Sequence, residues 1–183
     1  MDDAQAALSD QIDDATQRLL STARGLGEPE LAAPSRLPGW SRAHVIAHLA
    51  RNADAMRMLL VGARSGDARP AYASAEAREA DIEAGARQPP GELVADLAGA
   101  AMALRTVARQ LPGPAWLVAV QMLDSDPFPA GQLLTRRLVE VELHHADLGA
   151  GYGPADWPAA FAAMELAEPL ASYRRDRVQR PPA

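Results

Sequence analysis

Residues 130–148 read AGQLLTRRLVEVELHHADL and predict one helix, which a glycine-rich run ends. At about 100° per residue, Glu140 and His144 lie about 40° apart on one face of this helix. By the same periodicity, Glu142 and His145 point about 140° to 160° away from Glu140, so we expect neither to be a ligand beside it. Zinc is bound by imidazole nitrogen and carboxylate oxygen. The spacing therefore predicts that Glu140 and His144 are two ligands of one metal ion.

A third ligand must come from a facing helix, and His48 is the candidate. It lies on the apolar stripe of a helix predicted over 41–64. A buried imidazole needs a polar partner, because leaving its nitrogens unsatisfied is costly. Three protein ligands with one open position are typical of catalytic zinc sites. We therefore expect His48, Glu140 and His144 to hold one divalent ion, with zinc as the expected metal. The alternative is that these histidines are ordinary hydrogen-bonded residues.

The rest of the chain predicts an all-α fold. Helical periodicity and helix-ending residues indicate helices over 4–24, 41–64, 74–87, 91–110 and 130–148, and a last helix that reaches about residue 177 with an interruption at Pro169. The pieces 74–87 and 91–110 together are expected to form the third element. No strand-like alternation of useful length occurs. We predict an up-down four-helix bundle with a long connection and an extra C-terminal helix, in a single domain over 1–183.

The connection over 111–130 is the longest irregular segment and is rich in proline. Long ordered connections of this kind often form lids or cavity walls. Two aromatic residues within it, Trp116 and Phe128, either close over the site or plug the end of the bundle. The sequence favours neither interpretation.

Composition excludes several classes of function. The net charge is −6, every basic residue is arginine, and no cysteine occurs. A nucleic-acid binder usually has a basic stripe, whereas basic charge clusters here only over 174–180, interpreted as a solvated helix end. No apolar run approaches the roughly 20 residues of a membrane span, and no signal peptide is recognisable. We therefore expect a cytoplasmic protein without disulfides, cysteine ligands, nucleic-acid partners or membrane partners.

Four motifs occur in one order over about residues 5–178. They are Leu-Pro-Gly-Trp-Ser (37–41) followed by His48-Leu-Ala-Arg-Asn-Ala-Asp; Arg78-Glu-Ala-Asp-Ile-Glu-Ala-Gly-Ala; Glu140-Val-Glu-Leu-His144-His-Ala-Asp147-Leu-Gly-x-Gly-Tyr; and Asp156-Trp-Pro. On these motifs the chain resembles the mycothiol-dependent maleylpyruvate isomerase family, in its N-terminal domain. That family belongs to the DinB-like metal-binding bundles.

The resemblance implies roles for particular residues. It places metal ligands at the same three positions, His48, Glu140 and His144, and a substrate-associated arginine at Arg78. Asp147 corresponds to the acidic residue one turn after the histidine, which would orient a ligand imidazole. His44 and His145 correspond to no ligand position. Arg78 also has a simpler interpretation, a surface ion pair with a neighbouring glutamate at 79 or 83.

The resemblance also implies an activity. A thiolate, from mycothiol as cosubstrate, would add to the conjugated double bond of maleylpyruvate, and rotation followed by thiol departure would give the trans isomer. Founding members carry a small C-terminal domain that helps to form the active site. We expect that domain to be absent here, and turnover of maleylpyruvate to be weak.

Two other functions remain open on the sequence. A metal-dependent hydrolase could use the same site, with Asp54 or Asp147 as general base, and a non-catalytic metal-binding bundle could keep the family fold. We expect a small-molecule electrophile and a low-molecular-weight thiol as partners. The sequence does not define the oligomeric state; a homodimer is compatible with it.

Overall fold

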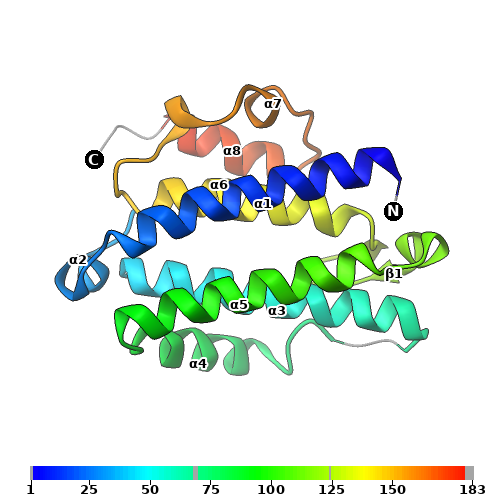
Figure 1. Ribbon diagram of the computed structural model, residues 1–183, viewed down its shortest axis with the longest axis horizontal. Helices are drawn as coiled ribbons and strands as arrows, with labels where there is room; N and C mark the ends of the chain where they lie inside the picture. The colour runs from blue at the N-terminus through cyan, green and yellow to red at the C-terminus, as the bar shows by residue number, and fades with distance from the viewer. Residues whose placement is uncertain (1, 68–69, 124, 180–183) are drawn as a thin grey trace.

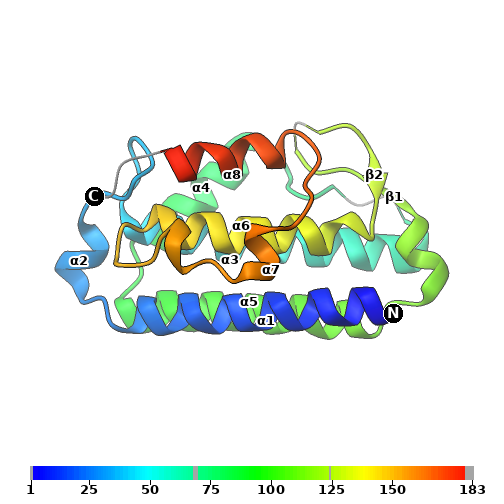
Figure 2. The ribbon, with the colours of Figure 1, turned by 90° about the horizontal axis from the view of Figure 1, so that it is seen from above.

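The structure is a computed structural model that describes residues 2–67, 70–123 and 125–179. Four long helices form a bundle: α1 (Asp3–Arg24), α3 (Arg42–Ser65), α5 (Pro90–Arg109) and α6 (Gln132–Asp147). Figure 2 shows α1 and α5 in one layer and α3 and α6 in the next. Two further helices, α4 (Ala75–Ala86) and α8 (Leu170–Gln179), pack on the far side of this second layer, α4 against α3 and α8 against α6. The predicted all-α bundle with an extra C-terminal helix is confirmed.

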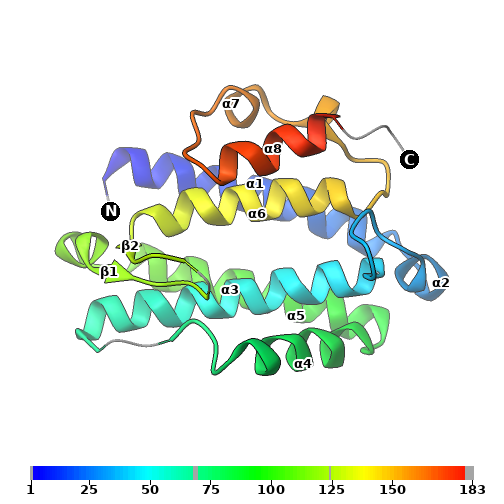
Figure 3. The ribbon, with the colours of Figure 1, turned by 180° about the vertical axis from the view of Figure 1, so that it is seen from behind.

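The position of α4 explains the directions of the four bundle helices. α3 and α5 run in the same direction, and α1 and α6 run the opposite way (Figures 1 and 3). α3 and α5 begin at the same end of the bundle because α4, which lies between them in the sequence, runs back along the outside of the bundle. The antiparallel neighbours α3 and α6 face each other through His48 and Glu140, and again through Asn52 and Arg137.

The expectation that 74–87 and 91–110 form a single element is wrong in one respect, because only α5 joins the bundle. α4 buries just Ile82 and Gly85, whereas α5 buries six residues. Pro89 caps α5 and separates the two helices. A Cβ at Gly85 would lie 2.9 Å from the Cβ of Ala47, so glycine there allows α4 to approach α3 closely. α4 therefore packs on the outer surface of α3 and buries few residues of its own.

The connection between α5 and α6 holds a 3-10 turn (Gly113–Leu117) and a two-residue antiparallel ladder of β1 (Ala119–Val120) and β2 (Phe128–Pro129). The carbonyl of Trp116 accepts from the amide of Gly131, just before α6 begins. The guanidinium carbon of Arg136 lies over the Phe128 ring, 4.0 Å from the centroid of that ring. Gly131 precedes Glu140 by nine residues, roughly 13 Å along a helix. Trp116 and Phe128 therefore lie at the end of the bundle and not beside Glu140.

The last predicted helix is divided in the structure. α7 (Ala159–Ala162) follows a 3-10 turn (Pro154–Asp156), and α8 begins only after Pro169. The basic cluster is also not simply solvated: Arg174 donates to the carbonyls of Phe161, in α7, and of Met164, just after it, and Arg177 pairs with Asp147. Arg180 lies outside the described residues. A further short helix, α2 (Glu28–Ala32), links α1 to α3. None of the described helices is long and apolar enough to span a membrane.

Candidate metal centre

Two helices bring the predicted ligands together. Ser41 caps α3, so His48 lies in the second turn of that helix and points toward α6. His48 Nε2 lies 3.0 Å from Glu140 Oε2, and His144 Nε2 lies 3.3 Å from the same oxygen. One donor atom from each of the three residues lies within 4.8 Å of the others. The structure therefore brings the three side chains into one group.

The geometry of this group is compatible with a divalent cation. Ligand atoms about 2.0–2.1 Å from a tetrahedral ion are separated from one another by roughly 3.3 Å. The contacts of 3.0 Å and 3.3 Å through one glutamate oxygen agree with that separation. Two imidazole nitrogens and a carboxylate oxygen also make up a common catalytic zinc donor set. The residues present fit the metal that the sequence suggested.

The group is accessible from one side. A cavity of about 220 Å³ reaches Glu140 and His144, and α8 supplies its outer wall with Leu170, Tyr173 and Arg177. The side chain of Glu140 is 30% exposed, and that of His48 only 7%. A small ligand can therefore approach the carboxylate while the His48 imidazole stays in the protein interior.

The three side chains influence one another's protonation. Burial lowers the pKa of His48. Burial alone would lower the pKa of His144 too, but hydrogen bonds to Asp147 and Glu140, with their negative charges, raise it to about 9. Burial opposes ionisation of Glu140, yet the hydrogen bonds to both histidines hold its pKa well below the ordinary value. Without a cation, Glu140 is thus an anion between two imidazoles.

A second carboxylate fixes the His144 ring. Asp147 Oδ2 lies 3.0 Å from His144 Nδ1, and the Asp147 side chain is fully buried. Arg177 of α8 holds both oxygens of that carboxylate, at 3.2 Å and 2.7 Å. An N–H at Nδ1 that donates to Asp147 leaves Nε2 as the nitrogen that can give up its proton and bind a cation. Arg177 was not singled out by sequence reasoning; its position within the basic cluster was the only signal.

α4 brings Arg78 to the edge of the group. Its Nη2 lies 3.1 Å from His48 Nδ1, its Nη1 pairs with Glu79, and its guanidinium lies 5.8 Å from the Tyr72 ring centroid. Arg78 therefore forms the expected ion pair with a neighbouring glutamate and also lies beside the candidate ligand His48. Glu83 pairs instead with His44.

The other two of the four histidines, His44 and His145, lie elsewhere. His44 also contacts the cap residue Ser41 through Nδ1, at 2.7 Å. His145 faces α1, where its Nε2 lies 2.8 Å from the Thr22 hydroxyl and its ring stacks on Tyr152. Glu142 faces the same way and binds Arg18. None of these side chains joins the group of three.

An all-α bundle in which two histidines and one glutamate meet beside an open cavity defines a helical protein with a candidate metal centre. The family described as "Mycothiol maleylpyruvate isomerase N-terminal domain" matches residues 12–149, and the chain belongs to this family. Similar solved structures are the mycothiol-dependent maleylpyruvate isomerase and a histidine-to-alanine mutant of it. Each has 29% sequence identity and a TM-score of 0.81, over 86% of this chain and 65% of that chain. This chain thus spans 65% of the length of those isomerases. No match was found among curated proteins.

Proposed function

We propose that this protein is a thiol-dependent isomerase or thiol S-transferase that acts on a small electrophile, with mycothiol as the thiol. The single observation that carries the proposal is the convergence of His48, Glu140 and His144 beside an open cavity, in a chain of this family. A maleylpyruvate-like molecule, with a double bond conjugated to a carbonyl, is the expected electrophile. The similar isomerases support this substrate class by name.

The three residues would hold one divalent metal, expected to be zinc, through His48 Nε2, Glu140 Oε2 and His144 Nε2. When bound with an open position, the metal would lower the pKa of an incoming thiol, so that the thiolate forms near neutral pH. Asp147 would keep the proton of His144 on Nδ1, and Arg177 would hold Asp147 in place. His144 would then present an unprotonated Nε2 to the metal.

Arg78 would change partner in this state. A neutral His48 that lends the lone pair of Nε2 carries its proton on Nδ1, and that nitrogen can no longer accept from Arg78. Nη2 of Arg78 would then be released, and the guanidinium would exchange its exposed partner Glu79 for a substrate carboxylate, bound through paired hydrogen bonds. Arg78 would thus position the electrophile next to the thiol.

The nucleophile must come from outside the chain, because the chain contains no cysteine. In the proposed reaction the thiolate sulfur bonds to one alkene carbon, and the electron pair moves onto the conjugated carbonyl. The former double bond rotates as a single bond. The electron pair then returns, the carbon–sulfur bond breaks, and the trans alkene and the thiolate are released. Atoms and electrons balance without an oxidant or reductant.

Thiol binding tests the proposal more directly than turnover does, because this chain spans only 65% of the similar isomerases. We expect zinc-loaded protein to bind mycothiol with release of a proton. Calorimetry in two buffers of different ionisation enthalpy measures that release. His48→Ala and Glu140→Ala should lose both metal and thiol binding, whereas His145→Gln should keep both. Absence of binding to the zinc-loaded protein, or equally tight binding without metal, would contradict the proposal.

No observation favours hydrolysis. Asp147 is already bonded to His144 and Arg177, and Asp54 pairs with Arg51 and Arg57 on its own helix. Neither carboxylate is therefore positioned as a base for a water molecule at the group of three.

A further inference from the structure

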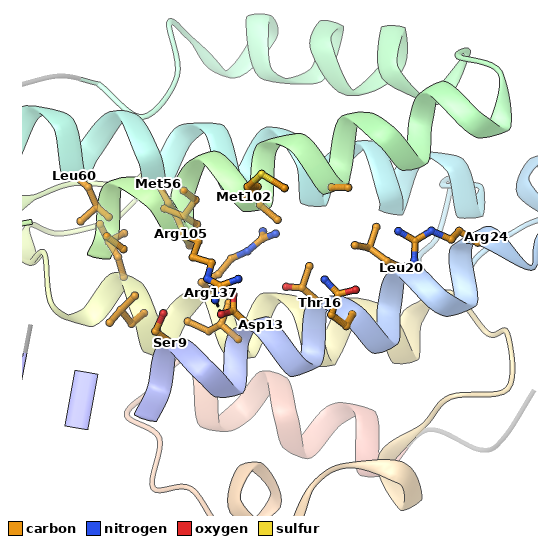
Figure 4. A pocket seen from close by; sticks show the side chains of 18 residues that line it. Ser9, Asp13, Thr16, Leu20, Arg24, Met56, Leu60, Met102, Arg105 and Arg137 are labelled. Atoms are coloured by element: carbon orange, nitrogen blue, oxygen red, sulfur yellow. Dashed lines mark ion pairs between the residues drawn. The ribbon is translucent and has the colours of Figure 1, made fainter. Parts of the chain in front are cut away.

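A second cavity, of about 210 Å³, lies between α1 and α5, on the opposite side of the α3–α6 layer from α4 and α8 (Figure 4). It exists because α5 turns small side chains toward α1. Ala98, Ala101 and Ala108 follow one another at helical spacing on one face of α5, with Arg105 among them. Side chains this short leave a gap that α1 does not fill. Most of the lining is apolar and includes Leu20, Met56, Leu60 and Leu133.

The cavity contains a buried guanidinium whose hydrogen bonding is incomplete. Arg137 is 1% exposed and reaches from α6 toward α3 (Figure 4). Its Nη1 donates to the carbonyl of Leu49 at 2.9 Å and to Asn52 Oδ1 at 2.8 Å. Its Nε and Nη2 have no hydrogen-bond partner among the residues that the structure describes. Burial lowers the pKa of Arg137 to about 10, so the group remains charged at neutral pH.

The two unpaired nitrogens form one edge of the guanidinium. Nε–H and the adjacent Nη2–H point in parallel, which is the geometry that binds both oxygens of a carboxylate. Unpaired donors of a buried charge are costly, and native proteins seldom leave them so. The Thr16 hydroxyl, which also lines the cavity, is buried without a partner among the described residues. Buried donors of Arg137 thus lie at this cavity without an acceptor among the described residues, whereas the carboxylate of Asp13 in the same lining lies beside Arg105.

The charged residues of the lining also favour an anionic ligand. Three arginines line the cavity, Arg24, Arg105 and Arg137, against one acidic residue, Asp13. Asp13 is already paired with Arg105 at 2.8 Å. This positive balance occurs within a protein whose net charge is −6. An anion is thus the ligand that this interior would accept.

We propose that the cavity between α1 and α5 is a binding site for a small carboxylic acid with an apolar body. The carboxylate would occupy the edge formed by Nε and Nη2 of Arg137, and the apolar body would lie against Leu20, Met56 and Leu60. The site is separate from the candidate metal centre and does not depend on the proposed function. Small-molecule sites in helical bundles commonly combine apolar walls with a few polar groups in this way.

The test is an NMR titration with hexanoate of protein labelled with ¹³C at the methionine methyl groups. Met56 and Met102 line the cavity, whereas Met122 and Met164 lie outside it. We expect saturable shifts at Met56 and Met102 only. Absence of saturable shifts, or larger shifts at Met122 or Met164, would overturn the proposal and leave water as the occupant.

A neutral analogue tests recognition of the anion in the unmodified protein. Hexanamide should bind at least about tenfold more weakly than hexanoate, because a hydrogen-bonded buried charge contributes more than a neutral pair. Equal affinities would contradict the assignment of Arg137. Arg137→Met should weaken hexanoate binding by a similar factor. Because that variant also loses the bonds to Leu49 and Asn52, the comparison of the two probes in the wild type decides the matter if the variant is unstable.

A substitution that fills the cavity gives an independent test. Ala101→Leu should abolish the hexanoate shifts, whereas Ala95→Leu, at an exposed position of α5 outside the cavity, should leave them unchanged. His48→Ala should also bind hexanoate normally. Loss of binding in His48→Ala would show that the probe reports on the metal centre, and would overturn the proposal of a separate site.

Discussion

Two faces of α6 carry the same residue types and use them differently. Glu140 and His144 face α3 and α8, and Glu142 and His145 face α1. The carboxylate of Glu142 is held by donors other than histidine, Arg18 at 2.7 Å and the Tyr152 hydroxyl at 2.5 Å. Glu140, by contrast, lies between the imidazoles of His48 and His144.

The adjacent residues His144 and His145 also differ in their partners and in their pKa values. His145 meets a threonine hydroxyl and a tyrosine ring, and burial together with the nearby Arg18 charge lowers its pKa to about 4. His144, held between two carboxylates, has a pKa of about 9. A glutamate and a histidine on one helix thus become a candidate metal site only where another helix supplies a third donor and no arginine or tyrosine occupies the carboxylate.

The largest expected effect distinguishes the two faces by metal content. Removing one of three protein ligands in His48→Ala or His144→Ala should lower metal affinity by more than the about 10- to 100-fold typical of outer-shell changes. Glu142→Gln and His145→Gln should keep stoichiometric metal. Elemental analysis of the purified proteins measures this. Unchanged metal in His48→Ala would contradict the assignment of the ligands.

The next effect concerns pH, and the two histidines should respond in opposite directions. The folded pKa of His145, about 4, is below its unfolded value of about 6.5. Its contribution to stability is therefore present above pH 6.5 and lost as pH falls toward 4, by roughly 3 kcal/mol. Urea unfolding at pH 7 and pH 4.5 should show this loss in the wild type and a smaller one in His145→Gln.

For His144 the sign is reversed in metal-free protein. Its folded pKa of about 9 is above the unfolded value, so its contribution is present below pH 6.5 and is lost as pH rises toward 9. An NMR titration of the imidazole protons should give separate midpoints near the two folded values. Similar midpoints for both rings would show that the two faces are electrostatically alike.

A smaller effect is expected from the carboxylate behind His144. Asp147→Asn removes the charge that holds the proton on Nδ1 and that binds Arg177, so metal affinity should fall about 10- to 100-fold. Competition with a chromophoric chelator measures the affinity. Asp156→Asn, at an exposed acid beyond α6, is the matched control and should bind metal as the wild type does. Wild-type affinity in Asp147→Asn would exclude this role for Asp147.

The smallest effect is expected on the α1 face. Tyr152→Phe removes one hydrogen bond to the buried Glu142 carboxylate, while Arg18 retains the other. The free energy of unfolding should fall by about 1 kcal/mol, without change in metal content. Tyr173→Phe, at a half-exposed position of α8, should have no effect on stability. A loss of metal in Tyr152→Phe would mean that the two faces are coupled.

Much of the fold could be predicted from local pattern. Periodicity and caps indicate the four bundle helices and the break before α5, because these signals lie within a few residues of each other. The position of α4 outside the bundle could not be predicted in the same way. It depends on how few apolar residues α4 offers and on the close contact of Gly85 with Ala47. The division of the last helix into α7 and α8 was likewise only hinted at by Pro169.

The sequence by itself determined the all-α class, the family, and the angular separation of Glu140 from Glu142 and His145, because positions on one helix are related by a constant rotation. Only the tertiary structure decided what each face meets. His48 and Glu140 are 92 residues apart, and Arg177 reaches Asp147 from 30 residues away. The incomplete bonding of Arg137 appears only once α1 and α5 pack around it. Contacts between helices depend on the packing of whole side-chain surfaces, which no local spacing in the chain encodes.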